Sequence, residues 1–561
     1  MKVVVETWLN EVLTYLKSSE IIPNDFNAKI NVTRTKDESH GDFASNLALI
    51  LAKPAKKSPR EMAELIVKNL GNKTVIEKME IAGPGFINFF LSQSASTQVI
   101  ESILSQGKSF GRSNVGQGNP VGVEYVSANP TGPLHIGHGR GAVVGDCLAR
   151  LLKATGWNVT REFYYNDAGQ QIINLACSVQ ARAKKFTPQS DEWQDDWYNG
   201  LYIIDVANAY INKETIDSSD KHVAGKGDIN DLEAIQEFAV AYLRREQDLD
   251  LKAFEVNFDV FFLESSLYNK GDVEATVKQL QDSGHTYEKD GALWLKTTDF
   301  GDDKDRVMRK SNGGYTYFLP DVAYHANKWD RGFKRCIGEF GSDHHSTVER
   351  VKIGLQALDV GIPKGWPEVV LHQMVTVMRG DVEVKLGKRA GGYVTLKDII
   401  DEVGKDATRY FLAARRVESQ LNFDLELAAS QSNDNPVYYI QYAHARICSV
   451  FRQMKEQSLT SDQVNGLENL NLLTSRYEKA LIDRLSKFPD LIKNAAQSLE
   501  THMVAHYLRD LANDFHTYYN AEKFIVDDVN MRDARLCLIT ATKQVLVNGL
   551  DLLAISAPEK M

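Results

Sequence analysis

Two histidines, His135 and His138, stand three residues apart in the segment PTGPLHIGHGRG. The segment joins a predicted strand to a predicted helix, and the free N–H groups at a helix start favour bound anions. Its glycines let a nucleotide approach the backbone closely. Imidazoles there can donate hydrogen bonds to a phosphate whose charge builds in a transition state. The spacing therefore indicates phosphate chemistry, although such a pair also occurs in surface turns and incomplete metal sites.

The residues around this pair are more specific than the pair itself. The string HIGH, preceded by SANPTGPL and followed by an amphipathic helix, resembles the signature of class I aminoacyl-tRNA synthetases, and the whole stretch is similar to the arginyl-tRNA synthetases. A later segment, VKLGKRAGG from Val384, resembles the KMSK loop of this family. Lys385 and Lys388 hold its lysine positions, with Leu386 and Gly387 where Met-Ser is commoner. Alone this segment is typical of a solvated basic loop; after HIGH it predicts a second catalytic element.

The resemblance implies a reaction and the residues that carry it. ATP would activate L-arginine to arginyl-adenylate, and the arginyl group would pass to the terminal ribose of tRNA(Arg). The implied catalytic residues are His135, His138, Lys385 and Lys388. The implied ATP-binding residues are Pro130, Thr131, Gly132, His135, Gly137, His138 and Lys388. Mg²⁺ would accompany ATP, held largely by its phosphates, and no tightly bound cofactor is expected.

The amino-acid pocket must recognise a planar cation with five donors, which requires fixed carboxylates and neutral acceptors. By resemblance, the arginine-binding residues are Glu124, Ser127, Asn129, His138, Tyr317, Asp321 and His344. Glu124 and Asp321 would hold the guanidinium. Asn129 and His138 would hold the α-amino and carboxylate end, and Tyr317 would form a wall of the pocket. Many relatives carry Gln at the position of His344. Without the family, Glu124 would be read as a paired surface carboxylate and Asp321, after a proline, as a helix N-cap.

No metal site is predicted. The neighbouring His344 and His345 resemble zinc ligands, but no Cys or carboxylate cluster completes a set. The five cysteines lie far apart, with no CxxC pair. They suggest neither a disulfide framework nor a zinc ribbon.

The predicted elements place the HIGH segment in a nucleotide-binding fold. An apolar strand (VGVEYVSAN), the PTGPLHIGHGRG loop, a long helix (GAVVGDCLARLLKATG) and a second strand (NVTREFYYN) form a β-loop-α-β unit. Such units build a doubly wound parallel sheet of Rossmann type, whose ligands bind beyond the carboxyl ends of the strands. We predict this catalytic domain over residues 116–405, with a polar helical insertion at about 175–300.

The two ends of the chain predict different domains. Residues 1–115 alternate strand-like runs (KINVTRT, GFINFFL) with helices (ASNLALILAK, PREMAELIVKNL), which predicts a small α+β domain. It resembles the additional domain of arginyl-tRNA synthetases that contacts the corner of tRNA. Residues 406–561 show 3.6-residue periodicity and resemble the helical anticodon-binding region of that family. The expected fold is thus a multidomain α/β protein with a C-terminal all-α bundle.

Composition limits the remaining classes. The chain has 561 residues, 43% hydrophobic and 25% charged, which suits a globular protein of several domains. Its formal charge of -10 does not exclude RNA, because a folded RNA is recognised by local basic patches and shape. No apolar stretch reaches the ~20 residues of a membrane span, and the N-terminus lacks a signal-peptide core. We expect a cytoplasmic monomer without a membrane partner.

Two other functions remain open at this stage. Another class I synthetase, such as the cysteinyl enzyme, would need a set of zinc ligands that the sequence lacks. A non-catalytic synthetase-like protein that only binds RNA would not require HIGH, Lys385 and Lys388. ATP–pyrophosphate exchange would separate a catalytic from a non-catalytic chain.

Overall fold

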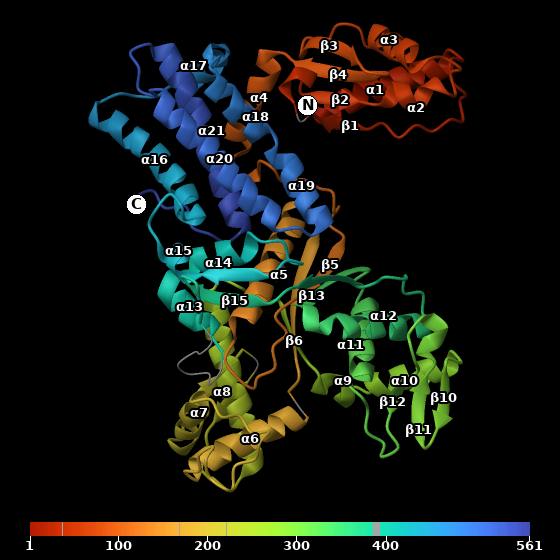
Figure 1. Cartoon of the computed structure of the whole chain (residues 1–561), viewed down its shortest axis with the longest axis vertical. Coiled ribbons are helices and arrows are strands. Elements are labelled where there is room, and N and C mark those ends of the chain that lie inside the picture. Colours follow the sequence, from red (N-terminus) through yellow and green to blue (C-terminus); the bar gives the residue numbers. More distant parts are fainter. Residues whose placement is uncertain (36, 168, 220, 385–392) are drawn as a thin grey trace. The chain divides into compact units, whose positions relative to one another are not determined.

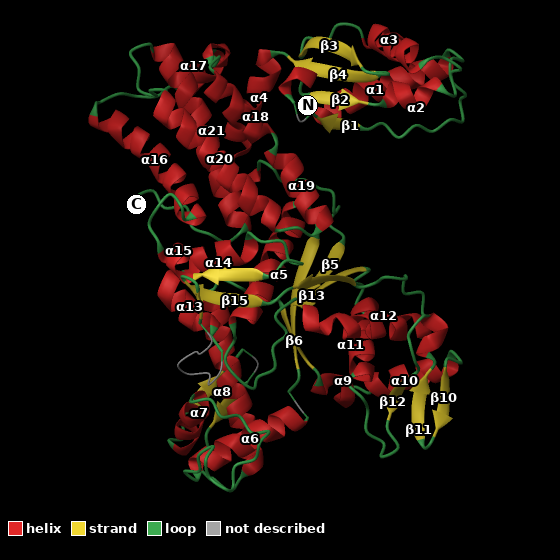
Figure 2. Ribbon diagram, viewed as in Figure 1, coloured by secondary structure: helices red, strands yellow, loops and turns green. Residues whose placement is uncertain are grey.

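The computed structural model describes residues 1–561 apart from 36, 168, 220 and 385–392 (Figures 1 and 2). The chain forms two compact units. Unit 1 contains residues 1–110, 447–487 and 513–545, and unit 2 contains residues 111–446, 488–512 and 546–561. Three of the five borders fall within long helices, which are α16 (Pro436–Glu456), α20 (His502–Ala521) and α21 (Val529–Leu552). The sequence-based division near residues 115 and 405 stays a prediction.

Unit 1 begins with a small α+β fold. Its antiparallel sheet has the order β1-β2-β4-β3, formed by Val32–Arg34, Phe43–Ser45, Phe86–Leu91 and Ile76–Ala82. The helices α1 (Lys2–Ser18), α2 (Leu47–Ala52) and α3 (Pro59–Leu70) share one apolar core with it. Ser58 starts α3 by a reciprocal cap with Glu61, which satisfies free N–H groups of the first turn. The predicted strands and helices of this segment are confirmed.

Helices make up the rest of unit 1. They are α4 (Gln93–Gln106), α17 (Gln463–Glu468), α18 (Arg476–Ser486) and the unit 1 parts of α16, α20 and α21. Gln93, at the first position of α4, donates hydrogen bonds to the carbonyls of Asn471 and Leu473 at 2.9 and 3.2 Å. The buried Glu478 of α18 accepts hydrogen bonds from Tyr518 and Arg535. Polar contacts as well as apolar packing therefore fix these helices.

Unit 2 is built on a five-stranded parallel sheet, which confirms the predicted doubly wound fold. The strands are β5 (Pro120–Glu124), β6 (Asn158–Tyr165), β9 (Val260–Leu263), β13 (Arg335–Gly341) and β14 (Glu368–His372). Their order is β14-β13-β5-β6-β9. The chain leaves β5 toward β6 and later returns to β13 on the other side of β5. The strand order thus reverses between β5 and β13, and ligands bind at such a point beyond the strand ends.

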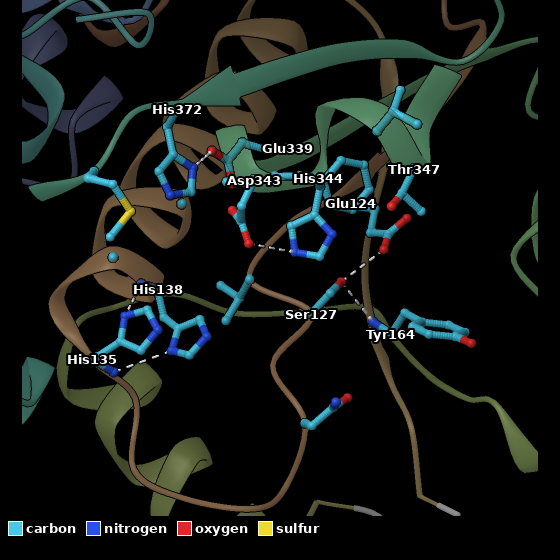
Figure 3. A pocket seen from close by; sticks show the side chains of 18 of the residues that line it. Glu124, Ser127, His135, His138, Tyr164, Glu339, Asp343, His344, Thr347 and His372 are labelled. Carbon is cyan, nitrogen blue, oxygen red and sulfur yellow. Dashed lines mark hydrogen bonds and ion pairs between the residues drawn. The ribbon is translucent and has the colours of Figure 1, made fainter. Parts of the chain in front are cut away.

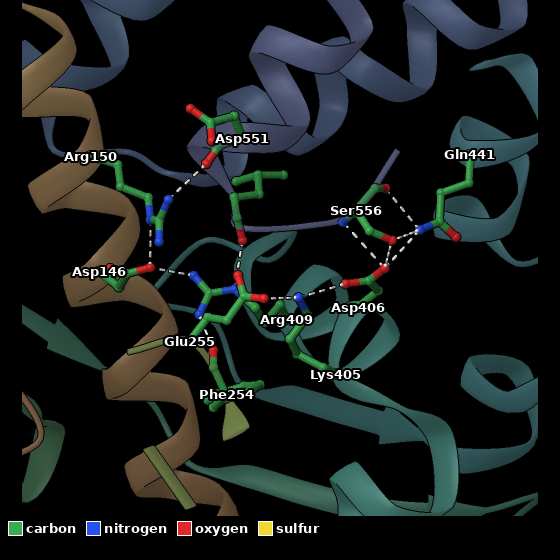
Figure 4. A network of polar contacts seen from close by, with 11 residues as sticks. Asp146, Arg150, Phe254, Glu255, Lys405, Asp406, Arg409, Gln441, Asp551 and Ser556 are labelled. Atoms are coloured by element: carbon green, nitrogen blue, oxygen red, sulfur yellow. Dashed lines mark hydrogen bonds and ion pairs between the residues drawn. The ribbon is translucent and has the colours of Figure 1, made fainter. Parts of the chain in front are cut away.

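Helix α5 (Ile136–Ala154), which starts with the HIGH segment, packs against β5, β6 and β13. A Cβ at Gly145 would lie 2.2 Å from Tyr125, so a glycine is required for this close approach. Asp146 of α5 is buried and accepts hydrogen bonds from Arg150 and Arg409 (Figure 4). Arg409 also donates to the carbonyls of Phe254 and Leu553. This buried arginine joins α5 to two distant parts of unit 2.

The segment at 175–300, which was expected to be helical, contains strands as well as helices. Three helices, α6 (Gln170–Ala183), α7 (Tyr202–Ile211) and α8 (Leu232–Ala253), have their own apolar core, with a short hairpin of β7 (Thr215–Asp217) and β8 (His222–Ala224). Strand β9 then pairs in parallel with β6. After α9 (Ser265–Asn269) and α10 (Asp272–Asp282), the strands β10 (Thr286–Lys289), β11 (Ala292–Leu295) and β12 (Arg306–Arg309) form an antiparallel sheet. The expectation of a helical segment was therefore wrong for β7 to β11, which are strands of only three or four residues with too little length to show an alternating pattern.

The remaining elements of unit 2 include helices and one small sheet. They are α11 (Phe318–Asp330), α12 (His345–Ala357), α13 (Leu396–Val403), α14 (Lys405–Ala413), α15 (Leu425–Ala429), α19 (Phe488–Ser498), and a small sheet of β15 (Val375–Arg379), β16 (Val382–Glu383) and β17 (Leu421–Asp424). In the described part of the chain, no helix combines the length and apolar character needed to cross a bilayer.

Candidate active site

A cavity of about 1130 Å³ lies in unit 2 beyond the carboxyl ends of the parallel strands (Figure 3). Its walls include the last residues of β5, β13 and β14, the residue that follows β9, and the start of α5. The predicted site residues that line it are Glu124, Ser127, Asn129, His135, Gly137, His138, Tyr317, Asp321 and His344. Pro130, Thr131 and Gly132 lie in the loop before α5 and do not line it. Lys385 and Lys388 lie outside the described residues.

His135 and His138 form a reciprocal cap at the start of α5. His135 Nδ1 accepts a hydrogen bond from the His138 backbone N–H at 3.2 Å, and His138 Nδ1 accepts one from the His135 N–H at 3.3 Å (Figure 3). The two rings stack with centroids 3.6 Å apart. Burial lowers the pKa of both imidazoles below the ordinary value, most strongly for His138. Each neutral ring therefore accepts at Nδ1 and carries its proton on Nε2, as a donor for a ligand.

The carboxylate of Glu124, at the end of β5, already has a cationic partner. It forms a buried ion pair with Lys328 of α11, and it accepts a hydrogen bond from Ser127 Oγ at 2.9 Å. Lys328 also lies 3.8 Å from Glu162, which in turn pairs with Arg331 at 2.6 Å. Two acidic and two basic side chains thus balance one another around Glu124. Glu124 remains in the cavity wall, but its charge is shared with Lys328.

Asp321 and Glu264 have a different environment. Burial, together with the charges of Glu264 and Glu124, raises the pKa of Asp321 to about 8. Burial also raises the pKa of Glu264, which accepts a hydrogen bond from Tyr164 at 2.7 Å. Within the part of the chain that the structure describes, no side-chain cation forms an ion pair with either residue. The cavity thus contains two acidic groups that a bound cation would stabilise.

Three further predicted residues line the cavity in different ways. Asn129 Nδ2 donates to Gln171 at 2.8 Å, and Asn129 Oδ1 accepts from the Asn166 N–H at 3.3 Å. Tyr317, the N-cap of α11, is 75% exposed, so it does not close over the cavity in this structure. His344 Nε2 lies 3.6 Å from the Asp343 carboxylate (Figure 3). In the described structure, none of these three side chains forms a hydrogen bond or ion pair with Asp321 or Glu264.

The structure also identifies cavity residues that the sequence analysis did not name. Glu264 follows the apolar strand VFFL directly, which was a usable signal for a residue at a strand end. Glu339, at the end of β13, accepts a hydrogen bond from His372 Nδ1, at the end of β14 (Figure 3). A Cβ at Gly141 of α5 would lie 2.5 Å from Glu339, so this glycine makes room for the pair. Among the described residues, no group of three His, Cys, Asp or Glu side chains could hold a metal ion.

The fold and the histidine-capped helix define a class I aminoacyl-tRNA synthetase. Residues 99–447 match the family model described as tRNA synthetases class I (R), catalytic domain. Residues 6–91 match the arginyl-tRNA synthetase N-terminal domain, and residues 440–561 match the DALR anticodon binding domain.

The chain belongs to the arginyl-tRNA synthetases. It is 55% identical over 562 residues to an arginine–tRNA ligase of Geotalea daltonii, with 100% of both chains covered. A structure titled as a putative arginyl-tRNA synthetase of Campylobacter jejuni is 30% identical, with a TM-score of 0.75 and coverage of 84% of this chain and 100% of that one. The Thermus thermophilus arginyl-tRNA synthetase, 21% identical over 100% of both chains with a TM-score of 0.74, shares the fold. The chain is thus a ligase that joins arginine to tRNA with ATP.

Proposed function

We propose that the cavity of unit 2 is the place where L-arginine and ATP react, with the residue roles set out below. The observation that supports this most directly is the pair of acidic side chains, Asp321 and Glu264, which lack a cationic partner among the described residues. A guanidinium presents a rigid fork of donors that can engage two carboxylates at once. Its binding would offset the desolvation and the mutual repulsion of these two groups.

Arginine would lie along the cavity wall from Asp321 toward α5. Asp321 and Glu264 would hold the guanidinium, and Glu124 would add negative charge while it remains paired with Lys328. Asn129 and His138 would hold the α-amino and carboxylate end, and Ser127 would fix Glu124. Tyr317 would become a wall on binding, and His344 would border the same region. When an enzyme uses no covalent nucleophile, positioning of this kind provides most of the rate enhancement over the uncatalysed reaction.

The start of α5 would receive the α-phosphate. The arginine carboxylate attacks the α-phosphorus, the bond to pyrophosphate breaks, and arginyl-adenylate forms. Nε2–H of His135 and of His138, with the N–H groups at the helix start, would stabilise the charge that develops on the phosphate oxygens. Pro130, Thr131, Gly132 and Gly137 would shape the ATP-binding backbone. From the resemblance, Lys385 and Lys388 would act on the leaving pyrophosphate.

Magnesium would enter with ATP rather than through a protein site. The described residues offer no group of three ligands for a metal ion, so the phosphates of ATP would supply most of its coordination. We therefore assign no step of the reaction to a protein-bound metal.

The second step would transfer the arginyl group to the terminal ribose of tRNA(Arg). Residues 1–115 would contact the corner of the tRNA, and the helices of residues 406–561 would contact its anticodon arm. We propose that the enzyme acts in the cytoplasm as a monomer. Size-exclusion chromatography with light scattering would test its oligomeric state.

The decisive experiment assays the purified chain against each of the twenty amino acids, with and without bulk tRNA. Pyrophosphate exchange and aminoacyl-tRNA formation are both measured. Of the twenty amino acids, only arginine should be attached to tRNA. Charging of another amino acid, or tRNA binding without exchange or charging, would contradict the proposal.

A further inference from the structure

The loop between β5 and α5 is fixed by side chains from the inserted helices. Gln247 of α8 donates hydrogen bonds from Nε2 to the carbonyls of Asn129 and Gly132, at 3.0 and 2.9 Å. Tyr202 of α7 donates from its hydroxyl to the carbonyl of Thr131 at 2.8 Å. Three carbonyls within four residues are thus held by α7 and α8, although neither helix belongs to the parallel sheet.

The loop needs such restraint because its backbone is strained. Val126 and Ser127, at its start, have φ values of 68° and 41°. Positive φ is unfavourable for residues with a side chain, most of all for a β-branched residue such as valine. Strained backbone of this kind persists only where surrounding contacts hold it in place. The hydrogen bonds from Gln247 and Tyr202 provide contacts of that type on the next residues of the chain.

The orientation of the Gln247 amide is determined by its other neighbour. Its Oε1 accepts a hydrogen bond from Arg244 Nη1 at 3.1 Å. Since a guanidinium can only donate, the carbonyl oxygen of the amide must face Arg244 and the NH₂ group must face the loop. Each of the two amide hydrogens then has one carbonyl to bind. Gln247 is 1% exposed, so an alternative orientation would leave buried polar groups without partners.

Arg244 is itself fixed from several sides. It is fully buried, and its Nη2 donates to Asp248 at 2.8 Å. Its guanidinium lies 4.6, 4.5 and 5.2 Å from the ring centroids of Phe163, Tyr165 and Phe261, which belong to β6 and β9. Cation–π contacts of this kind are strongest when desolvated. A buried chain of contacts therefore runs from the parallel sheet through Arg244 and Gln247 to the loop.

We propose that Gln247, oriented by Arg244, is a positioning residue for adenylate formation, because it holds the Asn129–Gly132 backbone in the shape that receives ATP. The inference rests on the proposed ATP-binding role of Pro130, Thr131 and Gly132. Gln247 does not line the cavity and so acts only through the loop. Errors of about 1 Å in such positioning can cost on the order of 100-fold in rate.

The test compares Gln247→Met with a matched control. Gln180→Met removes a similar hydrogen bond, from Gln180 Nε2 to the Ile229 carbonyl at 2.9 Å, in the same group of inserted helices but away from the loop. Single-turnover adenylate formation is measured with saturating arginine, tRNA present and ATP titrated. Gln247→Met should lower the maximal rate roughly 10- to 100-fold and raise the KM for ATP, whereas Gln180→Met should leave both within about twofold. The Tm of each variant separates this effect from a loss of stability.

Tyr202→Phe keeps the test decisive if Gln247→Met does not fold. This substitution removes only the hydroxyl that binds the Thr131 carbonyl. It should lower the maximal rate of adenylate formation and raise the KM for ATP, both by less than Gln247→Met does. The inference would be overturned if Gln247→Met and Tyr202→Phe, or whichever of them folds, had the same rate and the same KM for ATP as Gln180→Met. Charging of tRNA with arginine by the unaltered chain is measured in parallel. Its absence would count against the proposed function itself, whereas its presence with unaffected variants would count against the positioning role alone.

Discussion

At the scale of single residues, the acidic groups of the cavity differ in what they can offer a ligand. Glu124 is paired with Lys328 and hydrogen-bonded by Ser127, so part of its charge is already neutralised. Asp321 has no such partner among the described residues, and its pKa is raised to about 8. Burial likewise raises the pKa of Glu264, which also has no cationic partner among the described residues. Selectivity for a guanidinium should therefore depend more on Asp321 and Glu264 than on Glu124.

Asp321→Asn keeps the shape of the side chain but removes its charge. The KM for arginine should rise roughly 10- to 100-fold, since a hydrogen bond between two charged groups is lost. The KM for ATP should change little, and discrimination against citrulline should narrow. Steady-state pyrophosphate exchange measures all three, with Asp330→Asn, at the exposed end of the same helix, as the control. Unchanged discrimination against citrulline would show that Asp321 is not the guanidinium partner.

The raised pKa of Asp321 predicts that arginine binding releases a proton. At pH 7 a carboxyl with a pKa of about 8 is mostly protonated in the empty cavity. A bound guanidinium favours the ionised form, so the pKa falls and the proton leaves. Arginine affinity should therefore increase as the pH rises from about 6 to 8, by at most about tenfold per pH unit.

Calorimetry of arginine binding at pH 7, in buffers with different ionisation enthalpies, counts the protons released. Most of one proton should leave the unaltered chain, and the number should fall in Asp321→Asn. Binding enthalpies that are independent of the buffer would contradict the assignment.

At the scale of elements, the start of α5 combines a structural and a chemical role in one side chain. His135 caps the helix through Nδ1, and in the proposed function its Nε2–H would donate to a phosphate. Asparagine is a favourable N-cap but has no donor at the position of Nε2. The two roles can therefore be separated by substitution.

His135→Asn should retain the cap and stay close to the unaltered chain in Tm, while His135→Ala should lose about 1 kcal/mol of stability. Both should slow adenylate formation on the order of 100- to 1,000-fold, because each removes a donor to the developing charge. Thermal unfolding and single-turnover kinetics are measured on both variants. A normal adenylation rate in His135→Asn would leave the histidine with a capping role only.

At the scale of the whole molecule, residues 1–91 form a small fold that has its own apolar core. All buried residues of that core lie between Val5 and Phe89. The following helix, α4, is instead bound through Gln93 to the segment before α18. A deletion that ends at residue 91 therefore removes one core completely and leaves α4 with its partners.

Deletion of residues 1–91 should weaken tRNA binding more than ATP binding, because the predicted phosphate-binding segments lie outside it. The Kd of tRNA(Arg) is measured by filter binding, and the Kd of ATP by calorimetry, before and after the deletion. Equal losses for both ligands would indicate that these residues only support the fold.

The sequence by itself determined the features that depend on neighbouring residues. The strand, loop and helix around HIGH follow from apolar periodicity and from glycine at a strand-to-helix junction. The spacing of His135 and His138 indicated phosphate chemistry at the start of this helix, and the C-terminal helices show a 3.6-residue period over several turns. These patterns are local because a helix or strand is defined by contacts between residues a few positions apart. The resemblance to arginyl-tRNA synthetases followed from the same local segments.

Only the tertiary structure decided which distant residues meet. Lys328 neutralises Glu124 although 204 positions separate them, and Gln247 reaches Asn129 across 118 positions. Strand β9 joins the parallel sheet from within a segment whose composition predicted helices. Glu264 becomes a cavity residue for the same reason, since it follows β9 directly. No periodicity carries this information, because pairing across a sheet and burial of a charge depend on the path of the whole chain rather than on its local sequence.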